Sequence, residues 1–212
     1  MSSTSSRPRT RKPPAERAAE IIAAATAIAR EQGLSALTLR AVAERAGVAS
    51  GLVAHYQPTM DDLVARVYAD LVDEEVRDVE QVVGAVADPA ARLGALIDTL
   101  MDGEREELTV VWVEGWAMAR RNDALARAVA AQMERWQTLV ESIIEDGCRT
   151  GAFSTTEPGE VAWELIGMID GLNAQSLARA VRSAKRVVSA HEPRPVARDP
   201  ASAPGGDRRR AG

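Results

Sequence analysis

The sequence has few of the residues on which catalysis, disulfide bonding and metal binding most often depend. Its 212 residues include one cysteine, Cys148, and two histidines, His55 and His191. A single thiol excludes an intramolecular disulfide and a cysteine-only metal site, and we expect Cys148 to be a small interior residue rather than a redox sensor. No Glu-x-x-His pair, phosphate-binding loop or nucleophile elbow is present, so nothing predicts an enzyme, a metal centre or a cofactor.

Long apolar runs and aromatic residues are also scarce. No run of eighteen apolar residues and no secretory signal is found, and we therefore expect a soluble cytoplasmic protein with no membrane contact. Aromatic residues make up 3% of the chain, and no alternating apolar pattern with turns at hairpin spacing occurs. These absences leave an all-α fold as the simplest prediction.

Charge is distributed unevenly along the chain. The formal net charge is −5. Residues 1–58 hold 8 basic and 4 acidic side chains, so they carry +4 and the remainder carries −9. A basic head on an acidic body is the pattern expected of a DNA-binding domain joined to a regulatory domain.

The most informative segment is residues 38–57, which has the pattern of a helix-turn-helix. This motif needs two short helices packed across a tight turn, with the second free to enter a DNA major groove. Thr38 is placed to cap a first helix over residues 39–46, and Ser50 to cap a second that ends near Tyr56. Gly47 stands at the turn, where the chain needs a positive φ. The packed face would comprise Leu39, Val42, Ala43 and Ala46 from the first helix and Val53 from the second.

An ordinary helical hairpin would fit the same pattern, and the flanking sequence favours the DNA-binding interpretation. Residues 14–32 form an amphipathic helix that Gly33 ends, and Pro58 separates the motif from a helix that Thr59 opens. Three helices with the motif in second and third place make a small DNA-binding domain, residues 14–58.

The stretch from about residue 16 to 67 resembles the N-terminal domain of the TetR family of bacterial regulators. The residues that carry this likeness are Ala24, Gly33, Thr38, Leu39, Val42, Ala43, Ala46, Gly47, Val48, Gly51, Tyr56, Pro58 and Leu63. Within the family, the segment GLVAHYQ is similar to that of the choline-responsive betaine repressors, which have a His-Tyr pair here. A further likeness to this subgroup covers residues 104–180, in the tryptophans and the run from Ile169 to Leu172.

The resemblance implies a surface that binds double-stranded DNA. The DNA phosphates and base edges would be contacted by Ser50, His55 and Tyr56, and the DNA backbone by Thr38 and Arg40. Gly51 lies on the same face. Relatives usually have phenylalanine where Gln57 stands and a phosphate-binding lysine where Met60 stands. We therefore expect one fewer charged phosphate contact per subunit.

Residues 59–188 are expected to form a helical domain for ligand binding and dimerisation. The pattern predicts helices over 60–84, 89–102, 104–121, 123–150 and 158–186, with Asp88 and Asp123 as caps, Gly151 as a stop and Pro158 in a first turn. Residues 1–13 and 189–212 are expected to be disordered. The basic residues of the first segment fit a solubilising tail as well as an arm that reaches the DNA minor groove.

The last two predicted helices carry broad apolar faces. The residues are Leu139, Val140, Ile143 and Ile144 on one helix and Val161, Leu165, Met168, Ile169 and Leu172 on the other. Such faces suit a monomer core as well as an interface, and the resemblance implies that they form a four-helix homodimer interface. A two-fold dimer also suits DNA half-sites that lie about 34–36 Å apart.

The four tryptophans all lie in the second domain. Trp112 and Trp116 are four residues apart and share a helix face, with Met118 nearby and Glu114 turned elsewhere. Core packing explains any one of them, while together they could line an effector pocket, since indole faces attract cations. The candidate pocket residues are Trp112, Trp116, Met118, Trp136, Trp163 and Asp170; Asp170 would be either a pocket charge or a buried hydrogen-bonding group.

These patterns favour one function over two others. The favoured hypothesis, which the resemblance implies, is a homodimeric, ligand-responsive repressor that a small-molecule effector releases from a palindromic operator. The alternative is a DNA-binding regulator without such a switch, acting as an activator or through protein partners. An enzyme is disfavoured because no set of converging catalytic groups is present.

Overall fold

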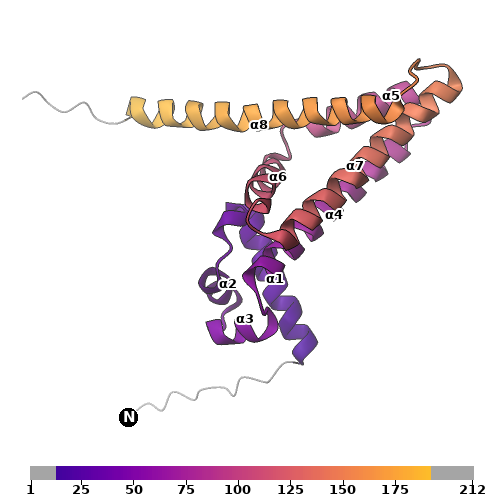
Figure 1. Ribbon diagram of the computed structural model, residues 1–212. Helices are drawn as coiled ribbons and strands as arrows, with labels where there is room; N and C mark the ends of the chain where they lie inside the picture. Colours follow the sequence, from indigo (N-terminus) through magenta and orange to yellow (C-terminus); the bar gives the residue numbers. More distant parts are fainter. Residues whose placement is uncertain (1–12, 192–212) are drawn as a thin grey trace, which may run out of the picture. The chain divides into compact units, whose positions relative to one another are not determined.

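A computed structural model of the protein describes residues 13–191, with side chains up to residue 179, and every element in this range is helical (Figure 1). The all-α class expected from the sequence is therefore confirmed. Residues up to Leu177 belong to one compact unit and the end of the last helix to a second. The elements are α1 (Pro14–Gln32), the 3-10 helix η1 (Leu34–Ala36), α2 (Leu39–Ala46), α3 (Ser50–Tyr56), α4 (Met60–Gly84), α5 (Pro89–Met101), α6 (Glu106–Ala119), α7 (Asp123–Thr150) and α8 (Pro158–His191).

Helix starts follow local capping chemistry at three predicted positions. The side-chain oxygens of Thr38, Thr59 and Asp88 each accept a hydrogen bond from an amide three residues further on. Each bond satisfies an amide that has no partner within its helix. At the other end of α7, Gly151 has a φ of 80°, as expected of a glycine stop.

The predicted cap of α7 is wrong by one residue. Asn122, rather than Asp123, is the capping residue, and its Oδ1 accepts from the Leu125 amide at 2.9 Å. Asn122 has extended backbone angles, whereas Asp123 is already the first helical residue. Adjacent Asn and Asp are both good caps, so the sequence alone does not choose between them. The same Asn122 side chain donates to the backbone oxygen of Asp61 at 3.1 Å and so ties the start of α7 to α4.

The N-terminal helices pack as a small three-helix domain around Ile21, Ile28, Val42 and Val53, all of which are buried. α4 continues from this domain into the second half, where it runs beside α7 (Figure 1). One face of α4 is buried along its whole length, from Leu63 to Val83. A single helix therefore contributes to the cores of both halves of the molecule.

Helix bounds in the second half differ slightly from those expected. α6 is shorter at both ends than the predicted 104–121, and α8 extends to His191 rather than to residue 186. The start of the C-terminal tail expected from residue 189 thus lies within α8. The rest of that tail and nearly all of the N-terminal arm, residues 192–212 and 1–12, lie outside the described residues.

Candidate functional site

The helix-turn-helix is built from local bonds that fix the angle between α2 and α3. Gly47 has a φ of 64° and a ψ of 36°, the left-handed conformation that favours glycine. The amide of Val48 then donates to the Ala43 oxygen at 2.9 Å, which closes the end of α2. Val42, Ala43 and Val53 are buried between the helices. The turn glycine agrees with the sequence prediction, as do Val42, Ala43 and Val53 of the packed face. Leu39 is partly buried against the core, whereas Ala46 is half-buried and does not belong to it.

The predicted cap of α3 is wrong. Helix α3 begins at Ser50 itself, its N-cap residue is Ala49, and no side chain caps it. Ser50 is exposed, and it is already the first helical residue rather than the residue that precedes the helix. The hydroxyl of Ser50 is consequently available at the outer surface of α3.

The side chains expected to meet DNA lie mostly on the surface. Thr38, Arg40, Gly51 and His55 are exposed. Tyr56 is half-buried and packs against the core, with its ring edge-on to that of His55 at a centroid distance of 5.2 Å. Met60, the first residue of α4, has an uncharged side chain that packs partly against the core. This position therefore offers no charge to a phosphate. The Tyr56 ring is packed against the core, whereas the outer face of α3 is exposed to solvent.

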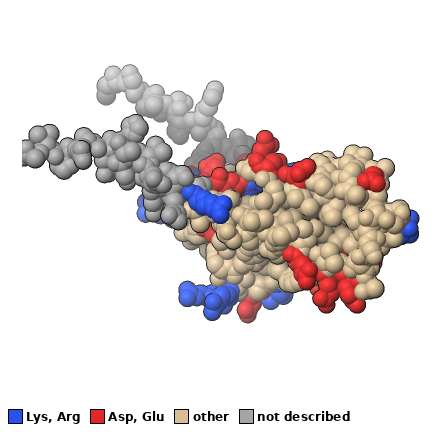
Figure 2. Space-filling view, turned by 90° about the horizontal axis from the view of Figure 1, so that it is seen from above, with Lys and Arg blue, Asp and Glu red and all other residues tan. Residues whose placement is uncertain are grey.

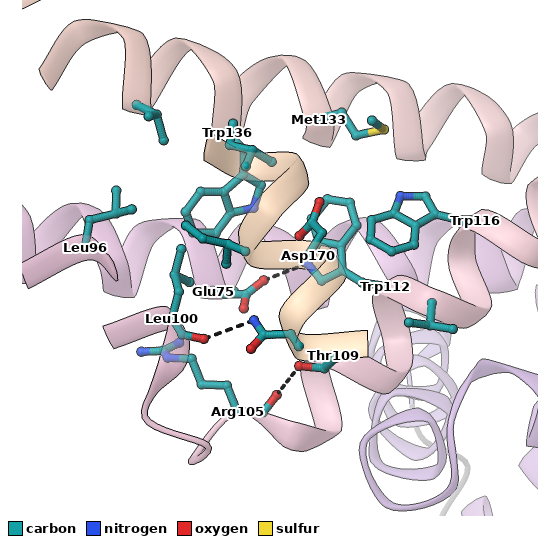
Figure 3. A pocket seen from close by; sticks show the side chains of 15 residues that line it. Glu75, Leu96, Leu100, Arg105, Thr109, Trp112, Trp116, Met133, Trp136 and Asp170 are labelled. Atoms are coloured by element: carbon teal, nitrogen blue, oxygen red, sulfur yellow. Dashed lines mark hydrogen bonds between the residues drawn. The ribbon is translucent and has the colours of Figure 1, made fainter. Parts of the chain in front are cut away.

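A cavity lies within the second half of the molecule, between α4, α5, α6, α7 and α8 (Figure 3). Its walls are mostly apolar and aromatic, with two carboxyl groups and one guanidinium group. The lining residues are Glu75, Leu96, Leu100, Arg105, Thr109, Trp112, Val113, Trp116, Met133, Trp136, Val140, Ile166, Ile169, Asp170 and Asn173.

The structure brings four of the six candidate pocket residues to this cavity: Trp112, Trp116, Trp136 and Asp170. Trp163 does not line it, because its side chain lies on an outer face of α8 and is 51% exposed. Met118 instead borders a separate groove beside Asp61 and Asn122. Helical periodicity places residues on a face, but it does not tell which face of α6 or α8 turns to the cavity.

Sequence reasoning missed Glu75, whose side chain is only 5% exposed. A signal existed, since Glu75 lies midway between the buried Leu71 and Val79 at a spacing of four, where an apolar residue is expected. The indole Nε1 of Trp112 donates to the Glu75 Oε2 at 2.9 Å (Figure 3). Arg105 and Asn173 were also missed, and Asn173 donates from its amide to the Leu100 oxygen at 3.0 Å.

Burial controls the ionisation of the two cavity carboxyl groups. It raises the pKa of Glu75, an effect that the Trp112 hydrogen bond and the nearby Arg105 charge partly offset. Burial likewise raises the pKa of Asp170, to about 6. Burial therefore disfavours the ionised form of both groups, and perturbed pKa values of this kind are common at functional sites.

Two of the indoles, those of Trp112 and Trp116, lie in an aromatic cluster that continues to Tyr68 of α4. Trp112 and Trp116 have ring centroids 5.6 Å apart, and the Tyr68 ring meets Trp112 edge-on at 5.5 Å. The Trp116 Nε1 is buried without a hydrogen-bond acceptor among the described residues. A buried donor with no partner is uncommon in proteins and favours a ligand or water as its acceptor.

Metal and membrane features are not found in the part of the chain that the structure describes. Within residues 13–191 no three His, Cys, Asp or Glu side chains are grouped so as to hold a metal ion, and no helix there has the length and apolar character of a membrane span. Cys148 is a half-buried free thiol.

Comparison with known protein families gives a match for each half of the chain. Residues 21–67 match the family described as bacterial regulatory proteins of the tetR family. Residues 89–192 match the C-terminal domain of the BetI-type transcriptional repressors. The chain belongs to the TetR family. Its members are transcriptional regulators rather than enzymes, and this chain combines their DNA-binding domain with a BetI-type C-terminal domain.

Individual TetR-family relatives agree with this assignment. The HTH-type transcriptional regulator BetI of Paraburkholderia phymatum is 30% identical over 160 residues, which cover 74% of this chain and 79% of that protein. A TetR regulator structure from Haloarcula marismortui is 25% identical with a TM-score of 0.68, covering 83% of this chain and 96% of that one. A transcriptional regulator from Saccharomonospora viridis, solved in complex with choline, has a TM-score of 0.69 at 20% identity, covering 77% of this chain and 86% of that one.

Proposed function

We propose that this TetR-family regulator is a homodimeric repressor that an organic cation releases from an operator of two inverted half-sites. The observation that carries the proposal is the cavity in which Trp112, Trp136 and the buried Glu75 converge. A quaternary ammonium group such as that of choline is the effector chemistry that this cavity fits best. The likeness to a choline-bound regulator makes choline the first probe to use.

Three features of the cavity favour a cation over a neutral or anionic ligand. Indole faces attract positive charge, by about 0.5–2 kcal/mol per contact. Burial raises the pKa of both carboxyl groups, so a bound cation would stabilise their ionised forms at a place where water screens the attraction only weakly. Arg105 is the one cationic residue among those that line the cavity, and it lies near Glu75. A ligand cation would therefore meet two carboxyl groups, Glu75 and Asp170, against the single positive charge of Arg105.

The connection to DNA runs through α4. Its first residue, Met60, is separated from α3 by only three residues, and Glu75 lies at its middle. The salt bridge from Arg30 on α1 to Glu74, at 2.7 Å, fixes α4 to the DNA-binding domain as well. An effector that binds more tightly to a shifted position of α4 would favour the arrangement that does not fit both half-sites. In the bacterial cell this exchange would take place in the cytoplasm, where the operator is.

Helix α8 supplies the surface for a second copy of the chain. Val161, Met168 and Leu172 are exposed by 37%, 58% and 47%, and their spacings of seven and four place them in one stripe along the helix. The view from above in Figure 2 shows a broad uncharged surface with both acidic and basic side chains toward its edges. An exposed apolar stripe of this kind is expected to be covered, and a two-fold dimer would present two α3 helices to DNA.

Binding of a labelled operator fragment, followed by fluorescence anisotropy during a choline titration, tests the proposal. The operator would first be selected in vitro from random sequence. We expect nanomolar to micromolar binding that nonspecific DNA does not displace, and release of the DNA as choline binds. Tight binding that neither choline nor related quaternary amines reverses would instead favour a regulator without a small-molecule switch.

Replacement of Tyr56 by phenylalanine tests the DNA-binding surface. If the hydroxyl contacts a phosphate, its loss removes one hydrogen bond and lowers affinity about three- to tenfold for every DNA sequence alike. The ring and its packing are unchanged, so thermal stability should stay constant. Anisotropy on the operator and on random DNA measures both affinities; equal affinity of the two proteins would remove Tyr56 from the contact set.

The pH dependence of effector binding follows from the raised pKa values. A carboxylic acid whose pKa is raised by burial stays protonated at a pH where it would ordinarily be ionised. The ionised form attracts a cation, so choline affinity should increase as pH rises through the pKa of Asp170, which is about 6. Below that value, affinity should fall by up to about tenfold per pH unit as the proton competes with the cation.

Tryptophan fluorescence titrations with choline between about pH 5 and pH 8 measure this dependence. The Asp170→Asn protein is the control: its choline affinity should be lower, and the part of the pH dependence that Asp170 supplies should be absent, while any contribution of Glu75 remains. An affinity that decreases with rising pH in the unmodified protein would exclude a carboxylate-bound cation.

A further inference from the structure

Helix α6 touches the cavity with one face and the DNA-binding domain with another. Trp112 and Trp116 line the cavity, while Glu114, which lies between them in sequence, points away from it. The Glu114 carboxylate reaches the connection between α1 and α2, 79 residues earlier in the chain. One helix therefore carries both cavity residues and a polar contact to the helix-turn-helix domain.

The contact consists of two hydrogen bonds to one residue. The Ser35 backbone amide donates to Glu114 Oε2 at 3.0 Å, and the Ser35 hydroxyl donates to Oε1 at 2.7 Å. Ser35 lies in η1, whose first amides have no partner within so short a helix. Both carboxylate oxygens are thus engaged, and hydrogen bonds to an ionised acceptor are stronger than neutral ones.

Gly33 makes room for this carboxylate. Its φ of 85° and ψ of 171° are angles that only glycine adopts readily. A Cβ atom built on Gly33 would lie 2.5 Å from the Glu114 Oε2. The backbone conformation and the space at residue 33 therefore both require glycine while the Glu114 contact is formed.

The connection on the other side of the contact is short and is anchored by two buried leucines, although Ser35 itself is exposed. Leu34 and Leu37 flank Ser35 and are 0% and 7% exposed, and Thr38 follows directly as the cap of α2. A displacement of Ser35 would therefore be passed to α2 rather than absorbed by a loose loop. On the cavity side, the Trp112 bond to Glu75 and the close packing of Gly115 on the Tyr68 ring join α6 to α4.

We propose that Glu114 is a positioning residue that couples the cavity to the helix-turn-helix domain through α6, η1 and α2, in parallel with the connection through α4. This inference rests on the proposed function in so far as an effector in the cavity moves α6. Glu114 touches neither the DNA-facing residues nor the cavity, so its effect falls on the coupling between the two sites.

The test compares Glu114→Ala with Glu114→Gln, and uses Glu106→Ala as the matched control. Glu106 is an exposed residue of the same helix, so its replacement removes an equal charge without breaking the contact. Three quantities are measured for each protein: choline affinity without DNA by tryptophan fluorescence, operator affinity without choline, and operator affinity at saturating choline. The ratio of the two operator affinities is the coupling, which for allosteric proteins is about 5- to 150-fold.

We expect Glu114→Ala to reduce this ratio at least about fivefold, to near unity for a weakly coupled protein, while choline still quenches the tryptophans. Glu114→Gln keeps an acceptor for the Ser35 amide and should recover part of the coupling, whereas Glu106→Ala should leave it unchanged. A residue needed only for stability would lower the melting temperature without changing the ratio. An unchanged ratio in Glu114→Ala would overturn the proposal.

A second measurement needs no effector and separates this inference from the effector assignment. If choline does not bind the unmodified protein, the effector class is wrong, and a double-mutant cycle on operator affinity tests Glu114. Trp112→Phe removes the hydrogen bond to Glu75 and should change operator affinity several-fold in the parent protein but much less in Glu114→Ala. Additive effects, or no effect of Trp112→Phe in either background, would overturn the proposal.

Discussion

Replacing Glu75 by glutamine is expected to raise the choline concentration needed for half-maximal tryptophan quenching at least about thirtyfold, equivalent to roughly 2 kcal/mol. The carboxylate is buried beside Trp112, where water screens its attraction for a cation only weakly. Glutamine has nearly the same shape, and its amide oxygen can accept the hydrogen bond from the Trp112 Nε1. The substitution therefore removes the charge while it preserves the packing of the cavity.

Measurements of thermal stability and of operator binding distinguish a loss of choline affinity in the Glu75→Gln protein from misfolding. Because burial raises the pKa of Glu75, the ionised side chain costs folding free energy in the absence of a cation. Glutamine removes that cost, so the melting temperature of the Glu75→Gln protein should be equal or higher. Operator binding without choline should be retained, and choline should no longer release the DNA at concentrations that release it from the unmodified repressor.

Asp78→Asn is a suitable control for Glu75→Gln. Asp78 is on the same helix but exposed, and its replacement removes the same charge from the protein surface. Its choline affinity should stay within about twofold of the parent value, since exposed charges are screened. Equal choline affinities in the unmodified, Glu75→Gln and Asp78→Asn proteins would show that the cavity does not hold a cation through Glu75.

The second large effect is expected from a charge in the apolar stripe of α8. Met168→Glu should convert the dimer to a monomer and lower operator affinity at least about a hundredfold. A dimer binds the second half-site as an intramolecular event, and this gain, typically 10²- to 10⁴-fold, is lost when the two subunits separate. A glutamate buried at the interface would need a partner of opposite charge, and the stripe of Val161, Met168 and Leu172 offers none.

The position of Met168 makes this experiment informative. The side chain is 58% exposed in the single chain, so a glutamate there should leave the helix and the fold intact. Light scattering or sedimentation gives the mass, and anisotropy gives the operator affinity. Ser154→Glu, in the exposed loop before α8, adds the same charge outside the stripe and should remain dimeric. A Met168→Glu protein that stays dimeric would place the interface on another surface.

Much of the DNA-binding domain could be predicted from the sequence because its determinants are local. Thr38 caps an amide three residues away, and Gly47 supplies the left-handed turn within its own motif. The errors were also local: Ala49 and Asn122, not Ser50 and Asp123, precede the first helical residue. Asn122 and Asp123 have similar capping ability, whereas Ala49 is a much poorer cap than Ser50. The start of α3 therefore does not follow capping preference.

The cavity shows where local patterns stop being sufficient. Trp112 and Trp116 were grouped correctly on one face because they lie four residues apart, and the structure brings Trp136 and Asp170 to the same cavity. Trp163 and Met118 were grouped with them by composition, yet they face elsewhere. Which face of each helix turns inward depends on the crossing of five helices, and this is a property of the packed core.

The sequence by itself determined the helical class, the helix-turn-helix and the family, since periodicity, caps and turn glycines act over three to five residues. Tertiary structure alone decided which distant groups meet. Glu75 and Trp112 are 37 residues apart, and Ser35 and Glu114 are 79 apart. Their contacts depend on how α6 fits between α4, α7 and the α1–α2 connection. The free energy that selects this arrangement comes from burial of apolar surface, which is not directional, and the polar contacts then form where that packing brings donors and acceptors together.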